Sequence, residues 1–576
     1  MTTLAIAEVP QIRRAVKVHP SQTVAGMKFG DLNGLRILFI NMPLRESAKP
    51  NNPPLGPGLL AARARQYGAE VSILDLNAYR IQDEAARLIG QINGRHLTYP
   101  ETESLLVRHM NEYGEPHIIA LSGMITTLRW QEWTVATCRR LVRDVFIISG
   151  GGLATEVKEG LFNWLPDLDC VAHSEGDDIM LVLARDVLQS LRFGKSLENV
   201  SECLGTIGGR KRFLYGGDRP LDLDGLPFAA WDLLHRDVDG NPVLEWYIQT
   251  PVWGLAANNS SATPFTMKRS LTTISSRGCP YACAFCYRGA QGERNYGMRS
   301  PENLVAEARW LQETYGIDFF GFVDDNFAVD VRRIRALVEA FGPLNGLRWG
   351  THTRLDEAAD ERAELMAKAG CVYIGFGAES ASARVLERMN KGGFILRPRG
   401  AKSNVLRRIG DFNFPETMVK GIENCRRFGI HANCTWIMAY PGETLQDLKI
   451  SAAFILWQEK LMTEGLTPGS LAYGNARAAV NRKMFVATAY PGTEMFKDPA
   501  CRQILIDDFG IGFRADGEPV ADQALRDYIL ELDDATKVMH GRDGRPLNFG
   551  AMPEAEFLEA RGYVDSGQIE KILDMR

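Results

Sequence analysis

The amino-acid sequence predicts an α/β protein made of two parallel sheets. Within residues 35–191, short apolar runs of strand length alternate with helix-length segments, and the same alternation restarts at residue 268. A stretch rich in Gly, Pro, Asp and Asn separates the two series, as expected for a connection between domains. The expected organisation is a leader (1–34), a doubly wound, Rossmann-like domain (35–191), a linker (192–267), a partial (β/α)6 barrel (268–495) and a small C-terminal cap (496–576).

The front domain begins with the run LRILFINMP, which is too short for a helix and ends at proline. A helix-length segment ending in glycine follows, and then a second apolar run, so the three form one strand–helix–strand unit. In a doubly wound parallel sheet, ligands bind at the carboxyl ends of the strands. The expected strands are 35–43, 69–77, 117–123, 145–152 and 168–176, with helices at 56–68, 127–143 and 177–191.

The second series has six strand-length runs, most of them separated by helix-length segments, and suits a partial parallel barrel. The basic segment 391–414 interrupts the helix expected after the fourth strand. It is interpreted as a lid, as a site for an anionic substrate or as a solvated surface loop. The expected strands are 270–278, 319–325, 347–354, 371–380, 431–442 and 481–492, with helices near 301–315, 330–342, 358–369 and 416–428.

Composition and charge argue against several classes of protein. A formal net charge of -5 and a pI near 6.1 leave no basic footprint, so we expect no nucleic-acid partner. No segment is apolar for long enough to span a membrane, and the N-terminus lacks a secretory signal pattern, so we expect a cytoplasmic protein. Ten cysteines with a single tight cluster do not resemble a disulfide framework. In a reducing compartment, clustered thiols more often hold metal or do redox chemistry.

Three cysteines share the loop SSRGCPYACAFCYRG, with the spacing C-x3-C-x2-C: Cys279, Cys283 and Cys286. A structural zinc site normally takes four Cys or His ligands in two separated pairs, and no fourth ligand lies nearby in the sequence. On a four-iron cluster, three thiolates leave one iron free to bind a substrate or cofactor. A structural or zinc-binding role for the three thiols is the alternative.

This spacing, with Phe285 directly before the third cysteine, resembles the loop of the radical S-adenosylmethionine (SAM) superfamily. The resemblance implies a [4Fe–4S] cluster on the three cysteines, whose open iron binds the amino and carboxylate groups of SAM. It further implies that an electron passed to SAM releases a 5′-deoxyadenosyl radical. An external electron donor of the flavodoxin or ferredoxin type is therefore expected.

Polar residues at the ends of later barrel strands also resemble positions of that superfamily. Asp324 and Asp325 follow the second strand, Arg354 ends the third and Glu379 ends the fourth. The resemblance implies that these groups face the cofactor, with Arg354 and Glu379 at its carboxylate and ribose. The segments MAYPGET and AYPGTEMF resemble its fifth-strand and closing motifs. Taken singly, each residue has an ordinary explanation as a helix cap, a surface ion pair or a solvated strand end.

A doubly wound domain directly upstream of such a barrel resembles the cobalamin-binding subgroup of the superfamily. Four segments that follow strands carry this resemblance, and small residues there would let a corrin approach the backbone: NMPLRESAKPNNPPLGPG, LSGMITTLRW, SGGGLAT and AHSEGDD. A nucleotide site or a tight turn is the alternative for the glycine run. The residues that this resemblance assigns to cobalamin are Ser122, Thr126, Gly150, Gly151 and Gly176.

Many cobalamin domains supply a histidine below the cobalt from a D-x-H-x-x-G loop, and this sequence has no such motif. His117 precedes a strand and His173 lies in AHSEG, so both are interpreted as ordinary strand-end residues. We therefore expect cobalamin to bind base-off, without a histidine ligand. The loop 122–128, or Arg45 in the first loop, is then expected beneath the corrin.

The resemblance implies methylation of an unactivated carbon through a 5′-deoxyadenosyl radical and methylcobalamin, on a small-molecule, lipid or peptide substrate. A relative of the same architecture carries out oxidative ring closure on a porphyrin, so non-methylating radical oxidation or cyclisation is the second hypothesis. A third, from another class, is a cofactor-binding sensor or electron carrier without turnover, which predicts a saturated cluster. No motif in the linker or the cap identifies the substrate or a catalytic residue.

Overall fold

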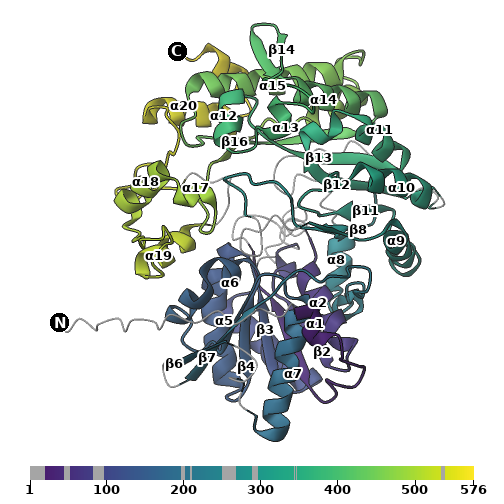
Figure 1. The fold of residues 1–576 in the computed structure, drawn as a ribbon, viewed down its shortest axis with the longest axis vertical. Coiled ribbons are helices and arrows are strands. Elements are labelled where there is room, and N and C mark those ends of the chain that lie inside the picture. The colour runs from purple at the N-terminus through teal and green to yellow at the C-terminus, as the bar shows by residue number, and fades with distance from the viewer. Residues whose placement is uncertain are drawn as a thin grey trace.

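The computed structural model describes residues 20–44, 52–81, 96–195, 197, 202–207, 210–249, 267–287, 296–342, 344, 347–532 and 539–576. These residues form two α/β units stacked along the long axis of the molecule, with the N-terminal sheet at the bottom of Figure 1 and the second sheet above it. Each unit contains a parallel sheet with helices packed on it, which confirms the predicted fold class.

The N-terminal sheet has seven strands in the order β2-β1-β3-β4-β5-β7-β6, and only β6 runs antiparallel to its neighbour. Its central strands are buried on both faces: Ile37 and Phe39 of β1 pack with α2 and α7, whereas Leu38 and Ile40 pack on the opposite side. This two-sided burial explains the continuous apolar run. The strands are β1 Arg36–Asn41, β2 Glu70–Asp75, β3 Ile118–Ser122, β4 Phe146–Gly150, β5 Cys170–His173, β6 Glu202–Ile207 and β7 Arg210–Gly216.

The three predicted helices correspond to α2, α5 and α7, and the described part of this unit also contains α1, α4, α6 and α8. The α-helices are α1 Pro20–Val24, α2 Leu55–Arg65, α4 Tyr99–Tyr113, α5 Leu128–Leu141, α6 Gly152–Val157, α7 Asp177–Phe193 and α8 Val243–Gln249. Short 3-10 segments are η1 Ala78–Arg80, η2 Ile125–Thr127, η3 Lys158–Asn163 and η5 Trp231–Leu234.

The range 192–267, predicted as a linker, contributes two strands to the N-terminal sheet, so this sheet continues beyond residue 191. β7 pairs in parallel with β5, and β6 closes the edge as a hairpin. The buried Arg212 breaks the apolar pattern that marks a strand: its guanidinium donates to the carbonyls of Pro166 and Leu168. A charged residue inside a strand concealed β7 from an analysis of hydrophobic pattern.

The second sheet has six parallel strands in the order β17-β16-β13-β12-β11-β8, which are the six predicted strands in sequence. β17 is the most shortened of the six, because its pairing with β16 stops after two residues, and β8 is also much shorter than predicted. The strands are β8 Ser270–Thr273, β11 Phe319–Phe322, β12 Arg348–Arg354, β13 Cys371–Glu379, β16 His431–Met438 and β17 Phe485–Val486, and two short pieces, β9 Ser276–Arg277 and β10 Gly297–Met298, pair antiparallel.

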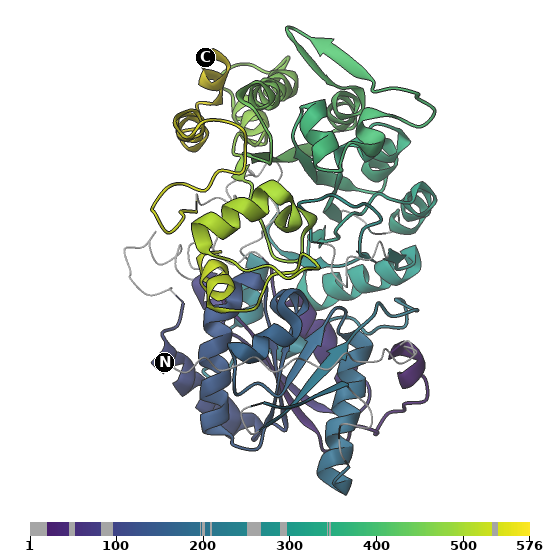
Figure 2. The ribbon, with the colours of Figure 1, turned by 60° about the vertical axis from the view of Figure 1, so that its left-hand side comes forward.

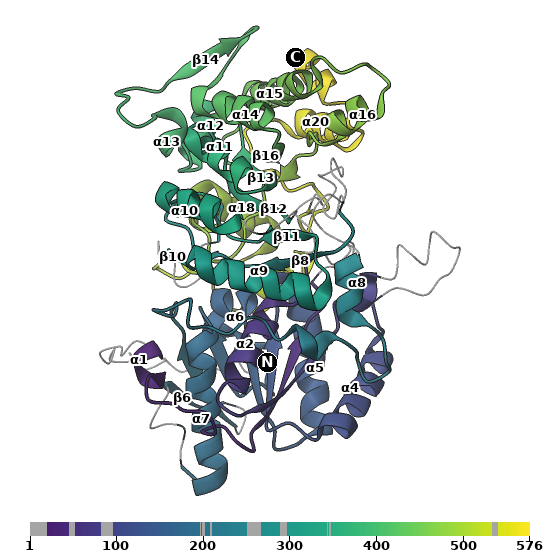
Figure 3. The same ribbon diagram turned by 90° about the vertical axis from the view of Figure 1, so that its right-hand side faces the viewer.

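Helices cover the outer face of this curled sheet (Figure 3). Along β13, Ile374, Phe376 and Ala378 belong to the core shared with the helices, so the alternate residues Gly375, Gly377 and Glu379 face the interior of the barrel. The helices are α9 Pro301–Tyr315, α10 Val331–Phe341, η7 Leu355–Ala358, α11 Glu361–Lys368, α12 Ala383–Arg388, α13 Gly393–Leu396, α14 Glu416–Phe428, α15 Leu445–Thr463 and α16 Leu471–Ala478.

The basic segment 391–414 forms α13 and most of a hairpin, β14 Leu406–Ile409 with β15 Phe412–Pro415. The hairpin projects from the end of the barrel farthest from the N-terminal unit (Figures 1 and 3). Phe414 packs against Phe454 of α15, with ring centroids 5.2 Å apart. This position favours the surface-loop interpretation over a lid.

The C-terminal region, predicted as one cap, divides into two parts. α17 Glu494–Lys497, α18 Pro499–Phe509 and α19 Gln523–Glu531 form the yellow-green group that lies beside the N-terminal unit in Figure 2. Arg526 of α19 pairs with Glu132 of α5 at 2.6 and 2.9 Å. α20 Glu554–Asp565 and η8 Ile569–Asp574 instead pack near α15 on the barrel.

In the described part of the chain, no helix is both long and apolar enough to cross a membrane.

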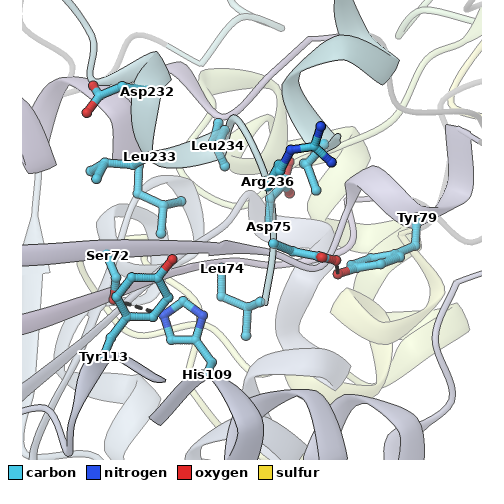
Figure 4. Close-up of a pocket in the computed structure, with 13 residues that line it drawn as sticks. Ser72, Leu74, Asp75, Tyr79, His109, Tyr113, Asp232, Leu233, Leu234 and Arg236 are labelled. Atoms are coloured by element: carbon cyan, nitrogen blue, oxygen red, sulfur yellow. Dashed lines mark hydrogen bonds between the residues drawn. The ribbon is translucent and has the colours of Figure 1, made fainter. Parts of the chain in front are cut away.

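A polar pocket of about 100 Å³ lies beside the edge strand β2, between α4 and the segment 232–243 (Figure 4). Buried His109 points to Ser72, with Nε2 2.9 Å from Oγ. Burial lowers the pKa of His109 to about 4. Asp75 is buried beside it and accepts hydrogen bonds from Asn41 (2.7 Å) and Tyr247 (2.8 Å). These contacts fasten α4 and α8 to the edge of the sheet.

Acid should destabilise the N-terminal unit partly through His109. The folded ring titrates at about 4 and the unfolded ring near 6.5, so between these values the unfolded state binds more protons and stability falls as pH falls. At about pH 5 the loss amounts to about 2 kcal/mol. Urea unfolding at about pH 7.5 and about pH 5 should show that His109→Gln loses about 2 kcal/mol less than the wild type. Equal losses would contradict this assignment.

Candidate functional site

The candidate site lies where the carboxyl ends of the two sheets meet. The cysteine loop follows β8 and β9, and two backbone hydrogen bonds fix its centre: Ala284 N–H donates to Met389 O, and Met495 N–H donates to Ala284 O, each at 2.8 Å. Cys279 is half-buried, Cys283 is buried and Cys286 is exposed. The loop therefore presents its thiols from a fixed backbone.

Two cations pack against aromatic side chains of this loop. The Arg354 guanidinium lies 4.1 Å from the ring centre of Tyr281, and its Nη1 is 3.9 Å from Cys283 Sγ. Lys391 Nζ lies 5.8 Å from the ring centre of Phe285. Positive charges near thiolates favour the ionised form and offset the negative charge of a thiolate-bound cluster. The donor set and its surroundings therefore fit an iron–sulfur cluster.

Burial raises the pKa of the Cys279 thiol. Deprotonation of this residue is therefore expected to accompany metal binding, because a thiolate is the ligand form. Within the described ranges, no three His, Cys, Asp or Glu side chains form a group that could hold a single metal ion.

The two neighbouring aspartates after β11 have different environments. Asp324 is buried and accepts hydrogen bonds from Ser275 N–H and Ser276 Oγ, both at 2.6 Å, and from Ser275 Oγ. Its carboxylate thus fastens β11 to the segment that leads into the cysteine loop. Asp325 has an exposed side chain and accepts a hydrogen bond from the Gly278 backbone. Of the two, Asp325 is the one available to a ligand.

The pKa of Asp325 is raised, first because protein surrounds much of the carboxyl group and then because Asp324 and Glu175 carry like charges nearby. Glu175 belongs to the N-terminal unit, so the electrostatic environment of Asp325 is set by both units. A carboxyl group in such a position gains from a cationic ligand group.

Glu379 ends β13 in a left-handed backbone conformation, with φ of +64°. Its Oε1 is 3.3 Å from Lys391 Nζ, and burial raises its pKa. A Cβ at Gly377 would lie 2.6 Å from the same Oε1, so the glycine makes room for the carboxylate. Strained non-glycine residues of this kind cluster at ligand sites.

Arg354 is buried against the cysteine loop and already paired. It bonds to Asp356 at 3.0 Å and to the Lys391 carbonyl at 3.1 Å. The structure thus brings Arg354 and Glu379 together through Lys391, a residue not assigned from the sequence. Their assignment to the carboxylate and ribose of a cofactor stays a prediction.

His352 on the inner face of β12 was also not assigned from the sequence. A Cβ at Gly375 on the next strand would lie 2.5 Å from His352 Cδ2, so glycine at 375 accommodates the imidazole. The alternating glycines of CVYIGFGAES are the sequence signal for this space, because residues two apart share one face of a strand.

The five residues predicted for cobalamin all lie along the carboxyl edge of the N-terminal sheet. Ser122 and Gly150 are paired on adjacent strands. Thr126 in η2 donates to the Leu44 carbonyl at 2.7 Å. Gly151 has φ of +85°, and a Cβ there would lie 2.7 Å from Gly123 O. Gly176 precedes α7, where a Cβ would lie 3.2 Å from Leu60.

The two histidines that we interpreted as strand-end residues have local partners. His117, at the amino end of β3, accepts a hydrogen bond from Arg36 N–H at 2.9 Å, and so lies at the edge of the sheet opposite the site. His173 Nδ1 lies 3.0 Å from Ser174 Oγ. Arg45 lies outside the described residues.

Comparison with protein families matches residues 273–455 to the Radical SAM superfamily. An uncharacterised methyltransferase of Pyrococcus horikoshii is 23% identical over 484 residues, covering 82% of this chain and 84% of that protein. The cytidylyl-2-hydroxyethylphosphonate methyltransferase of Streptomyces wedmorensis is 25% identical over 428 residues, covering 69% and 72%. A shorter match joins the chain to an anaerobic magnesium-protoporphyrin IX monomethyl ester cyclase of Cereibacter sphaeroides, 24% identical over 284 residues, covering 48% and 42%.

Among solved structures, the cobalamin-dependent SAM radical enzyme OxsB, with aqua-cobalamin and SAM bound, matches with a TM-score of 0.60. It is 16% identical, and the match covers 93% of this chain and 67% of that chain. At this identity the likeness concerns the fold, and it extends over both parallel sheets.

Replacing Gly377 by Ala should weaken SAM binding about tenfold, because the added Cβ displaces the Glu379 carboxylate and disturbs its contact with Lys391. Equilibrium dialysis with labelled SAM on the cluster-loaded protein measures this. Gly393→Ala is the matched control, since a Cβ there meets nothing within 4 Å. Equal SAM affinity in both variants would remove Glu379 from the site.

Proposed function

We propose that the chain, whose residues 273–455 match the Radical SAM superfamily, is a cobalamin-dependent enzyme that methylates an unactivated carbon. The match over residues 273–455 confirms the resemblance inferred from the cysteine loop. A curated relative that matches 82% of this chain is named as an uncharacterised methyltransferase, and the fold of both units is similar to that of a cobalamin-dependent radical enzyme. These similarities support methyl transfer as the chemistry.

The observation that carries the proposal is the contact between the glycine-bearing edge of the N-terminal sheet and the cysteine loop. Glu175, next to Gly176, bonds to Arg277, two residues before Cys279. A corrin on that edge would therefore lie close to a cofactor held at the cluster, as methyl transfer between them requires.

When bound, the cluster and SAM supply a 5′-deoxyadenosyl radical, and cobalamin supplies the methyl group. The chain itself contributes binding and orientation. Cys279, Cys283 and Cys286 hold the cluster, and Asp325 meets the cationic amino group of SAM. Glu379 orients the ribose, and Lys391 holds the Glu379 carboxylate in place.

The corrin site is proposed along Ser122, Thr126, Gly150, Gly151 and Gly176, with cobalamin base-off. The position of His117 at the opposite edge of the sheet supports the absence of a histidine ligand from that residue. A small-molecule substrate and an external flavodoxin- or ferredoxin-type donor complete the proposal. A cytoplasmic location fits the requirement for a reducing environment.

Radical oxidation or cyclisation without methyl transfer is the second candidate, favoured by the match to the magnesium-protoporphyrin cyclase. That match covers about half of this chain, whereas the two methyltransferase matches cover more than two thirds.

Anaerobic reconstitution with iron, sulfide and hydroxocobalamin, followed by reduction and methyl-labelled SAM, should place the label on cobalamin and release S-adenosylhomocysteine. No substrate is needed for this test. If cobalamin binds but stays unlabelled while 5′-deoxyadenosine forms, oxidation or cyclisation replaces methylation. If SAM is not cleaved at all, the non-catalytic sensor or carrier is favoured.

Cys283→Ser should abolish both the cluster absorption and 5′-deoxyadenosine formation, because the remaining two thiolates no longer hold a site-differentiated cluster. Cobalamin content should stay within about twofold of the wild type, since the proposed corrin residues belong to the other sheet. Visible spectra before and after reduction separate the two cofactors. Simultaneous loss of cobalamin would instead indicate a single shared binding site.

A further inference from the structure

One arginine joins the cysteine loop to the N-terminal unit. Arg277 Nη1 lies 2.6 Å from Glu175 Oε2, and its two terminal nitrogens each lie 3.1 Å from an oxygen of Asp177. The side chain of Arg277 is 13% exposed and that of Asp177 is 4% exposed. A buried two-point contact between an arginine and a carboxylate fixes both the orientation of the guanidinium and its distance from the carboxylate.

On the barrel side, Arg277 and the two residues that follow it have different roles. Arg277 contacts the N-terminal unit, Gly278 donates its backbone N–H to Asp325, and Cys279 is the first cysteine of the loop. Gly278 has φ of +76°, a conformation that glycine adopts without strain. A displacement of Arg277 would therefore also displace Asp325, the carboxylate expected to bind SAM, and Cys279, a ligand of the expected cluster.

On the N-terminal side, the partner loop is fixed from behind. Ser174 has φ of +74°, and its N–H donates to Thr155 Oγ1 at 2.9 Å. A Cβ at Gly217 would lie 1.7 Å from Glu175 O, so a neighbouring strand packs directly on this loop. Asp177 is the first residue of α7, where the helix dipole favours a carboxylate. Arg277 thus binds to a segment, Glu175 to Asp177, whose backbone is held in place by its neighbours.

We propose that Arg277 is a positioning residue that sets the distance between the corrin edge and the cysteine loop, so that methyl transfer depends on it while the binding of each cofactor does not. This inference rests on the proposed function. In the transfer, the S–CH3 bond of SAM breaks and a cobalt–carbon bond forms from the electron pair of reduced cobalamin. S-adenosylhomocysteine leaves, and the external electron donor supplies the pair.

The test compares Arg277→Gln with Arg526→Gln in the full-length, cofactor-loaded protein. Arg526 is a matched control because it also joins the N-terminal unit to a distant part of the chain through a two-point carboxylate pair, at 2.6 and 2.9 Å from Glu132. Neither Arg526 nor its partner Glu132 belongs to the cysteine loop or to the five residues assigned to the corrin. Arg277→Lys and Glu175→Gln probe the same contact with smaller changes.

The measurements are cobalamin and iron content, transfer of label from SAM to cobalamin, and 5′-deoxyadenosine formation. Arg277→Gln should keep both cofactors within about twofold and lower label transfer at least about tenfold, since misplaced reactants lose rate steeply. Arg277→Lys and Glu175→Gln should lie between this variant and the wild type. Arg526→Gln should transfer label within about twofold of the wild type.

A second readout does not need turnover: pulsed EPR gives the distance between cob(II)alamin and the reduced cluster. This distance should be broadened or lengthened in Arg277→Gln and unchanged in Arg526→Gln. The measurement also separates this inference from the proposed function. A wild type that binds cobalamin but transfers no label defeats methylation, whereas the distance comparison still decides the positioning role.

Three results would overturn the inference. Arg277→Gln could transfer label and keep the distance as the wild type does. Both arginine variants could lose cofactors and label transfer equally, which would indicate general loosening of the contact between the units. Finally, a wild type without bound cobalamin would defeat both this inference and the proposed function.

Discussion

The parallel direction of the strands is the constraint on which the site depends. In each sheet every strand except β6 ends at the same edge, so the residues that follow these strands collect there whatever their separation in sequence. The Arg277 contact holds these two edges together. Asp325, Glu379 and the cysteines thereby approach the glycines of the N-terminal sheet, although about a hundred or more residues separate the two groups along the chain.

Backbone strain marks the same boundary. Ser174, Glu379 and Ala439 are non-glycine residues with positive φ, and each directly follows or ends a parallel strand: β5, β13 and β16. Such conformations cost about 1–3 kcal/mol each and persist only where surrounding contacts determine them. Hydrogen bonding at Ser174 and the Lys391 contact at Glu379 are contacts of this kind. Strain from both sheets therefore coincides with the region where ligand binding is proposed.

Much of this fold could be predicted from the pattern of apolar residues. Buried parallel strands appear in the sequence as short apolar runs, and several helix ends are marked by glycine. β7 was missed because Arg212 is buried within it, and α4 was missed although Thr98 and Glu101 form a capping box. The cysteine spacing predicted the cluster loop. No local pattern predicted the Arg277 pair, whose partner lies 100 residues away, since long-range contacts leave no period in the sequence.

The two neighbouring aspartates show why a motif alone cannot assign roles. Both stand at the position that the resemblance gives to cofactor binding, yet Asp324 already accepts three hydrogen bonds from Ser275 and Ser276. Breaking the hydrogen bonds of a buried carboxylate costs free energy, so Asp324 has a structural role: it holds the end of β11 against Ser275 and Ser276. Its neighbour Asp325 has an exposed side chain that accepts a hydrogen bond from the Gly278 backbone, so it is the carboxylate available to a ligand.

Helices of the C-terminal region lie beside the edge assigned to the corrin. α19 packs against α5 and η2, beside the edge assigned to the corrin, and α18 and α17 connect it to the barrel. This segment reaches the N-terminal unit from the barrel independently of the chain that joins the two sheets (Figure 2). A radical formed at the cluster reacts with any accessible partner, so chemistry of this kind needs an enclosed space. The segment α17–α19 returns from the barrel to the N-terminal unit and places protein beside one of the two parallel edges, where such an enclosure is needed.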